Sequence, residues 1–173
     1  NMHEAAMGSD NDIPFYGACH NPHRPGYTPG GSSGGSGAAV AAGLCAAALG
    51  TDTMGSVRIP ASYCGVVGLK PSWGAISTRG TVALCRRLDH VGPLARSARD
   101  LKVLLDTMAG FDPDCAQSRQ IALRPAADAA LRIGVVDFGV AAQIDADVQC
   151  AFEDGMRVLA SLGHRPLALP GPS

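Results

Sequence analysis

Apolar residues at helical spacing mark two amphipathic segments in the second half of the chain. The first begins at Ser97, which forms a capping box with Asp100, and ends at Gly110. The second begins after Asp145 and ends at Gly163. These spacings predict two helices, each with one buried face. In the first helix the positions i, i+3, i+4 and i+7 are Leu101, Leu104, Leu105 and Met108.

The remaining elements are predicted from propensity and from short apolar runs. The alanine-rich run 38–48 predicts a helix that ends at Gly50, and 59–65 predicts a helical turn. The mixed interval 111–128 is predicted to be a surface loop. Strand, helix and strand follow one another at the end of the chain, an order typical of α/β proteins. Predicted strands cover 66–69, 82–84, 131–136 and 166–169.

Composition excludes several classes of protein. The chain has 173 residues, of which 46% are hydrophobic and 17% charged, as in a compact folded protein of one domain. A net charge of −1 argues against a nucleic-acid partner and an anionic-membrane anchor, and no apolar run is long enough to span a bilayer. The six cysteines have no CxxC pair and no zinc spacing. We therefore expect no metal, free and mostly buried thiols, and a cytoplasmic location.

The glycine-serine block 30–37 has two interpretations. Such blocks are often flexible linkers, but this one leads directly into a predicted helix, where free backbone N–H groups favour an anion or an oxyanion. The phosphate-binding P-loop requires a lysine where this block has Ser36 and Gly37. The alternative is serine chemistry, because Ser56 lies in a second tight glycine turn that would expose its hydroxyl. None of the five histidines has a recognisable triad spacing.

Two strings together resemble the amidase signature family of serine amidases. They are GGSSGGSGAAVAAG and ALGTDTMGSVRIPASYCGVVGLKPSWG, in this order. The resemblance implies an α/β amidase-signature fold, with a mixed central sheet flanked by helices. It also implies that residues 1–173 form a single incomplete domain whose signature core is 29–74, and that the chain is an interior fragment of a longer protein.

The resemblance also implies a catalytic group of two serines and a lysine, with no cofactor. Ser56 corresponds to the nucleophile, and Ser32, the first serine of GGSSGG, corresponds to the bridging serine that follows a cis peptide bond. The backbone N–H groups of Thr53, Met54, Gly55 and Ser56 correspond to the oxyanion hole. Neither Lys70 nor Lys102 matches the catalytic lysine, which we expect outside this chain. We therefore expect the chain alone to be inactive.

Three further features bear on the family pattern. Met54 stands where the family usually has glycine, and its side chain disfavours a positive φ. Arg58 is interpreted as the structural ion-pair partner of Asp52 in the same turn, with a contact to a substrate carboxylate as the alternative. Asp89 and His90, in the tract LDHVGPLAR, are predicted to form a buried hydrogen-bonded pair and not a catalytic dyad.

The sequence thus predicts hydrolysis of a linear C–N amide bond in a small-molecule substrate. The alternatives are the glutamine-hydrolysing subunit of a tRNA-dependent amidotransferase, which would need partner subunits, and a non-catalytic homologue. A glycine-loop nucleotide binder is the most distant alternative. A homodimer of the full-length protein is left open, and neither a nucleic acid nor a membrane is an expected partner.

Overall fold

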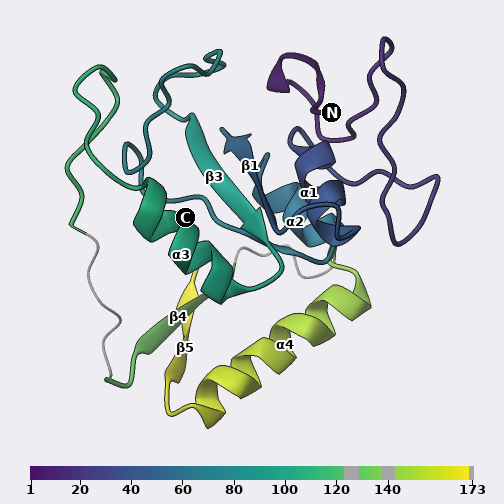
Figure 1. Cartoon of the computed structure of the whole chain (residues 1–173). Coiled ribbons are helices and arrows are strands. Elements are labelled where there is room, and N and C mark those ends of the chain that lie inside the picture. The colour runs from purple at the N-terminus through teal and green to yellow at the C-terminus, as the bar shows by residue number, and fades with distance from the viewer. Residues whose placement is uncertain (123–128, 138–142, 172–173) are drawn as a thin grey trace. The chain divides into compact units, whose positions relative to one another are not determined.

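The computed structural model describes residues 1–122, 129–137 and 143–171 (Figure 1). By its internal contacts the chain divides into two compact units, 1–123 and 124–173, and each is described by itself. The first unit contains η1 (Glu4–Ala6), α1 (Gly34–Ala41), β1 (Ala47–Asp52), α2 (Arg58–Tyr63), β2 (Val67–Gly68), β3 (His90–Ala95) and α3 (Ala98–Met108). The second contains β4 (Arg132–Asp137), α4 (Ala146–Ser161) and β5 (Arg165–Pro170).

The first unit is built on a three-stranded antiparallel sheet in the order β1-β3-β2. All six residues of β1 pair with β3, from Ala47 opposite Ala95 to Asp52 opposite His90. The central strand β3 contains Pro93, which has no N–H to donate, but its carbonyl accepts a hydrogen bond from the Leu69 N–H at 3.0 Å. This sheet ends β1 at Asp52, directly before the turn that holds Ser56.

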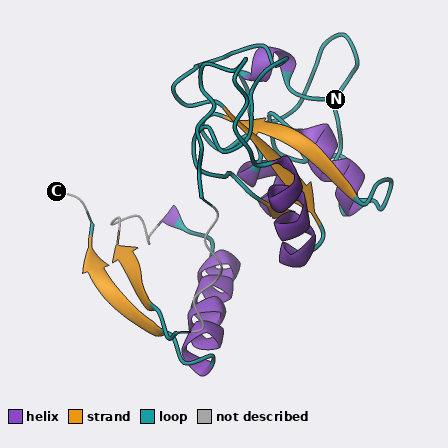
Figure 2. Cartoon of the chain, turned by 60° about the vertical axis from the view of Figure 1, so that its left-hand side comes forward, coloured by secondary structure: helices purple, strands orange, loops and turns teal. Residues whose placement is uncertain are grey.

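The core of this unit lies where α1 and α2 meet the sheet. Val40 of α1, Ala61 of α2 and Leu94 of β3 are buried and pack together with Val57. The helix α3 packs along β3, as Figures 1 and 2 show. The two glycine-containing segments predicted to carry the chemistry are therefore anchored to a shared core.

The helix predicted over 38–48 is wrong at both ends. Helix α1 begins inside the glycine block and ends at Ala41, before Gly43 adopts φ +73°. The following residues 47–52 form β1, because pairing with β3 outweighs the helix propensity of alanine. Gly50 does not end a helix. A Cβ there would lie 2.5 Å from the Ser33 Oγ, so its missing side chain allows the glycine-serine block to approach β1.

Several other predictions agree with the described residues. In α3, the Ser97 Oγ accepts a hydrogen bond from the Asp100 N–H at 3.1 Å, as the capping box requires. The predicted helices near 59 and 145 and the strands near 66, 131 and 166 are confirmed as α2, α4, β2, β4 and β5. Residues 82–84 are not a strand but an exposed loop, and β3 was not predicted because Gly92 and Pro93 break its strand pattern. The predicted loop 111–128 is confirmed up to residue 122, and 123–128 lie outside the described residues.

The second unit is a strand-helix-strand unit in which β4 and β5 pair in parallel and α4 contacts β5 (Figure 2). Antiparallel and parallel pairing therefore both occur along the chain, and the α/β class is confirmed. None of the described helices is long and apolar enough to cross a membrane. The assignment of 1–173 to one incomplete domain stays a prediction.

Candidate active site

Asp52 organises the turn that carries Ser56. Its carboxylate is fully buried and accepts backbone N–H bonds from Gly55 at 2.8 Å and Val57 at 3.2 Å. The Arg58 guanidinium donates two more bonds to it, from Nε and Nη2, both at 3.0 Å. Burial alone would raise the pKa of Asp52, but the Arg58 side chain and the two N–H groups outweigh it and hold the pKa below the ordinary value. The predicted ion pair is confirmed, and the same carboxylate also closes the turn.

The turn places its positive φ at Gly55 and not at Met54. Gly55 has φ +133°, and a Cβ at this position would lie 2.9 Å from the Ile59 Cδ1. Among the described non-glycine residues, positive φ occurs at three alanine and asparagine positions of the N-terminal segment and not at Met54. The backbone therefore accepts methionine at 54 without the penalty expected from the sequence. The Met54 side chain is 85% exposed.

Ser33 joins the glycine-serine block to the Ser56 turn. Its N–H donates to the Ser56 carbonyl at 3.1 Å. Its Oγ donates to the Thr51 carbonyl at 3.2 Å and accepts from the Thr51 N–H at 3.1 Å, as a neighbouring strand would. Sequence reasoning missed this role, because nothing in GGSSGG distinguishes the second serine from the first.

Ser32 is fully buried beside this junction. The peptide bond between Gly31 and Ser32 is cis, and the Ser32 carbonyl accepts a hydrogen bond from the His3 N–H at 2.8 Å. The Ser32 Oγ has no hydrogen-bond partner among the described residues. The structure therefore brings the segments of Ser32 and Ser56 into contact and leaves one buried hydroxyl unsatisfied between them and the N-terminal segment.

Ser56 opens onto a cavity of about 400 Å³. Thr53 and Met54 line it with Ser56, while the Gly55 N–H points to the Asp52 carboxylate. Of the four N–H groups predicted for an oxyanion hole, that of Gly55 is thus already bonded. Gly31, immediately before Ser32, also lines the cavity.

Asp89 and His90 are each bonded, but not to one another among the described residues. Asp89 accepts from the Thr53 hydroxyl at 2.6 Å and from the N–H groups of Leu84 and Cys85, so it fixes the loop beside the cavity. His90 bonds other groups. Its Nδ1 is 2.5 Å from the Leu88 carbonyl and 3.2 Å from the Asp52 carbonyl, and its Nε2 is 3.2 Å from the Lys70 Nζ.

The His90 bonds define its tautomer. A carbonyl can only accept, so Nδ1 carries the proton, and the Lys70 ammonium can only donate, so Nε2 is unprotonated. The predicted Asp89–His90 pair is wrong, because the side chains bond other partners. Asp89 bonds Thr53 and His90 bonds the Asp52 carbonyl, so both residues support the turn.

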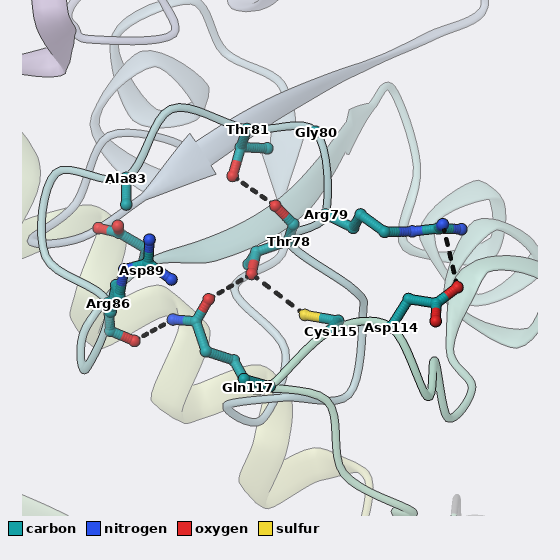
Figure 3. Close-up of a pocket in the computed structure, with 11 residues that line it drawn as sticks. Thr78, Arg79, Gly80, Thr81, Ala83, Arg86, Asp89, Asp114, Cys115 and Gln117 are labelled. Atoms are coloured by element: carbon teal, nitrogen blue, oxygen red, sulfur yellow. Dashed lines mark hydrogen bonds and ion pairs between the residues drawn. The ribbon is translucent and has the colours of Figure 1, made fainter.

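A second cavity, of about 270 Å³, lies between the loops 78–89 and 114–117 (Figure 3). The Thr78 hydroxyl donates to the Gln117 Oε1 at 2.5 Å, and the Gln117 amide donates to the Arg86 carbonyl. The Cys115 Sγ lies 3.6 Å from the Thr78 Oγ1. Sequence reasoning gave no signal for this network, since each of its contacts joins two residues more than 30 positions apart in the chain.

The state of the Cys115 thiol depends on which way these hydroxyl protons point. Donation from Thr78, and then from Ser77, would lower the pKa of Cys115 to about 6. However, the Thr78 proton is committed to Gln117, and the Ser77 hydroxyl donates to Asp112 at 2.6 Å. The Cys115 thiol can then donate to Thr78, which opposes the two largest causes of its lowered pKa, while the backbone N–H groups of Thr78 and Gln117 still lower it.

The six cysteines are free, as predicted, but only Cys64 is buried, so the expectation of mostly buried thiols is wrong. Burial, and then the neighbouring Cys19, raise the pKa of Cys64 to about 11. In the described part of the chain no group of three or more His, Cys, Asp or Glu side chains could hold a metal ion.

Comparison with known proteins gives one family throughout. Residues 1–172 match the family model described as Amidase. The chain is 44% identical over 190 aligned positions to a glutamyl-tRNA(Gln) amidotransferase subunit of Chromohalobacter salexigens, and the match covers 98% of this chain and 38% of that protein.

Two solved structures are similar in both sequence and fold. The corresponding glutamyl-tRNA(Gln) amidotransferase subunit from Thermotoga maritima has a TM-score of 0.91 at 36% identity, over 98% of this chain and 39% of its own. A 6-aminohexanoate cyclic dimer hydrolase has a TM-score of 0.85 at 40% identity, over 98% of this chain and 37% of its own. The chain thus spans less than two fifths of the length of each of these proteins.

Proposed function

This chain belongs to the amidase family, and on that premise we propose that the protein hydrolyses a linear C–N amide bond of a small molecule. In this proposal Ser56 is the nucleophile, Ser32 passes the proton, and a lysine outside this chain is the base. No cofactor takes part. We also propose a cytoplasmic location, in keeping with the six free thiols.

The observation that carries the proposal is the buried, unsatisfied hydroxyl of Ser32. Leaving such a group without a partner costs about 1–3 kcal/mol. A neutral lysine amine from another segment would accept the Ser32 proton and remove this cost. The Ser33 N–H bond to the Ser56 carbonyl holds the backbone of Ser56 against the segment that carries Ser32. This contact supports a proton relay from Ser56 through Ser32.

The proposed reaction has two steps. The Ser56 Oγ attacks the amide carbon, while its proton passes to Ser32 and the Ser32 proton passes to the lysine amine. The C–N bond breaks as the lysine returns a proton to the leaving nitrogen, so that ammonia or an amine departs and an ester remains on Ser56. Water then attacks the ester through the same relay and releases a carboxylic acid and free Ser56.

Backbone N–H groups of the turn would stabilise the oxyanion. Of the predicted set, those of Thr53, Met54 and Ser56 are assigned to the oxyanion in this proposal. The Gly55 N–H is assigned a positioning role, because its bond to the buried Asp52 fixes the orientation of the neighbouring peptides.

One observation favours a second candidate. The curated relative from Chromohalobacter salexigens is named as a subunit of glutamyl-tRNA(Gln) amidotransferase, which favours a glutamine-hydrolysing subunit that works with partner subunits. The structure of 6-aminohexanoate cyclic dimer hydrolase is as similar in sequence as that relative, within a few per cent. Release of ammonia from glutamine only in the presence of partner subunits would select the amidotransferase. Turnover of simple amides by the protein alone would select the hydrolase.

The test uses the full-length protein and three variants. We expect Ser56→Ala and Ser32→Ala each to lower amide turnover by at least about 10³-fold, because members of one catalytic unit fail together. Ser62→Ala changes an exposed serine on α2 and should keep full activity. With hydroxylamine in place of water, the unmodified protein should form a hydroxamate from the Ser56 ester. Turnover that survives Ser56→Ala would refute the assignment, and an unmodified full-length protein that turns over no amide would indicate a non-catalytic homologue.

A further inference from the structure

The cavity beside Ser56 has a strongly apolar wall. Its large side chains are Met7, Met54, Ile59 and Leu84, and none of the described residues that line it carries an ionisable side chain. Its volume of about 400 Å³ is within the range of small-molecule sites. Its assignment to part of a substrate rests on the function proposed above.

Two exposed methionines frame this wall from separate segments of the chain. Within this chain Met54 is 85% exposed and Met7 is 73% exposed, so neither side chain is packed against the described core. The backbone conformation does not require this exposure at Met54, since the positive φ of the Ser56 turn is at Gly55. Methionine is flexible and polarisable, and it adapts to apolar ligands of varied shape. The two side chains are thus suited to pack on a ligand.

Both methionines are held at fixed backbone positions. The Asp52 carboxylate fixes the turn directly after Met54 through the Gly55 and Val57 N–H groups. The Met7 N–H donates to the Glu4 carbonyl at 3.2 Å at the end of η1. A ligand would therefore order only the side chains, which lowers the entropic cost of binding.

The charged side chain that bonds a lining residue of the cavity is already satisfied. Asp89 bonds the lining residue Thr53, but it also accepts the N–H groups of Leu84 and Cys85. Its carboxylate is thus used in holding the loop and is not presented to a ligand. The described wall therefore offers no counter-charge to a ligand that carries an ammonium or a carboxylate.

We propose that the substrate amide carries an uncharged apolar group of at least four carbons, aliphatic or aromatic, that packs against Met54 and Met7. Met54 is then a specificity-determining residue. An amino-acid amide such as glutamine, whose ammonium and carboxylate would be buried against this wall without partners, is a poor substrate.

The test compares acetamide, hexanamide and L-glutamine with the full-length protein. We expect the kcat/KM for hexanamide to exceed that for acetamide by roughly tenfold or more, since each methylene that leaves water favours binding. Met54→Ala should lower the kcat/KM for hexanamide about tenfold and leave that for acetamide within twofold. Met2→Ala, which removes an exposed methionine outside this cavity, should change neither.

The outcomes separate this inference from the proposed function. If Ser56→Ala abolishes all turnover but acetamide or L-glutamine is the best substrate, the apolar site is refuted and amide hydrolysis stands. An equal fall in kcat/KM for acetamide and hexanamide in Met54→Ala would also refute the apolar site, since Met54 would then affect activity by holding the Ser56 turn and not by contact with the substrate. Turnover that is independent of Ser56 refutes the proposed function itself.

Discussion

Replacing Asp52 should destabilise the Ser56 turn more than any surface ion pair could account for. In Asp52→Ala the buried N–H groups of Gly55 and Val57 lose their acceptor, and each unsatisfied donor costs about 1–3 kcal/mol. Arg58 is 51% exposed and returns to water, so its pair adds at most about 1 kcal/mol. We therefore expect the free energy of unfolding to fall by about 2–7 kcal/mol. Asp52→Asn keeps one acceptor oxygen and should lose about half as much.

The contribution of the Asp52 carboxylate to the free energy of unfolding depends on pH. The pKa of Asp52 is held below its ordinary value of 3.8, so the folded state binds fewer protons than the unfolded state as the pH falls. The contribution of Asp52 is therefore fully present above the ordinary pKa and is lost as the pH falls through the lowered pKa of the folded state. In Asp52→Asn this part of the acid destabilisation should be absent.

Urea denaturation of the full-length protein at pH 7 and at pH 3 measures both effects. The urea concentration at the unfolding midpoint should be much lower for Asp52→Ala than for the unmodified protein at pH 7. At pH 3 the difference between the two midpoints should be smaller. Arg58→Met is the matched comparison, because it leaves the buried Asp52 carboxylate with its backbone N–H bonds alone, and it should cost less than Asp52→Ala. A loss in Asp52→Ala no larger than that of Arg58→Met would refute the view that the backbone bonds, and not the ion pair, carry the stability.

Three further changes test other parts of the site. Ser33→Ala removes both Oγ bonds to Thr51, and we expect it to cost about 1–3 kcal/mol in urea denaturation and to lower amide turnover as the two serines lose register. Gly55→Ala forces a Cβ onto φ +133°, and we expect turnover to fall at least about tenfold with a loss of at least about 1 kcal/mol. Alkylation of Cys115 by iodoacetamide, followed by peptide mass spectrometry, should show a midpoint well above pH 6. In Gln117→Leu the freed threonine hydroxyl can donate to Sγ, and the midpoint should fall toward about 6; a midpoint near 6 without the change would contradict the assigned proton positions.

What could be predicted from the sequence is what short-range rules determine. The α3 helix follows from the capping box at Ser97 and from helical spacing, both of which act within a few residues. The Asp52–Arg58 pair follows from two opposite charges in one tight turn. The amidase family follows from the two glycine-serine strings, whose order and spacing are highly specific.

The errors occur where distant segments meet. The local preference of the alanine run is helical, and only pairing with β3 turns 47–52 into a strand. Because β3 contains Gly92 and Pro93, neither partner of this pair has a strand pattern of its own. For the same reason the role of Ser33 and the bonds of Asp89 could not be predicted, since each depends on contacts made after the chain has folded.

The residues of the turn at 52–56 have separate roles, and this separation has a consequence for protein engineering. Asp52 and Gly55 set the backbone, while the Met54 side chain between them faces the cavity and solvent. A library that randomises Met54 and Met7 and keeps Asp52, Gly55 and Ser33 fixed would therefore sample new substrates at little cost to folding. The position at which this chain departs from its family's glycine is thus the natural starting point for changing its selectivity.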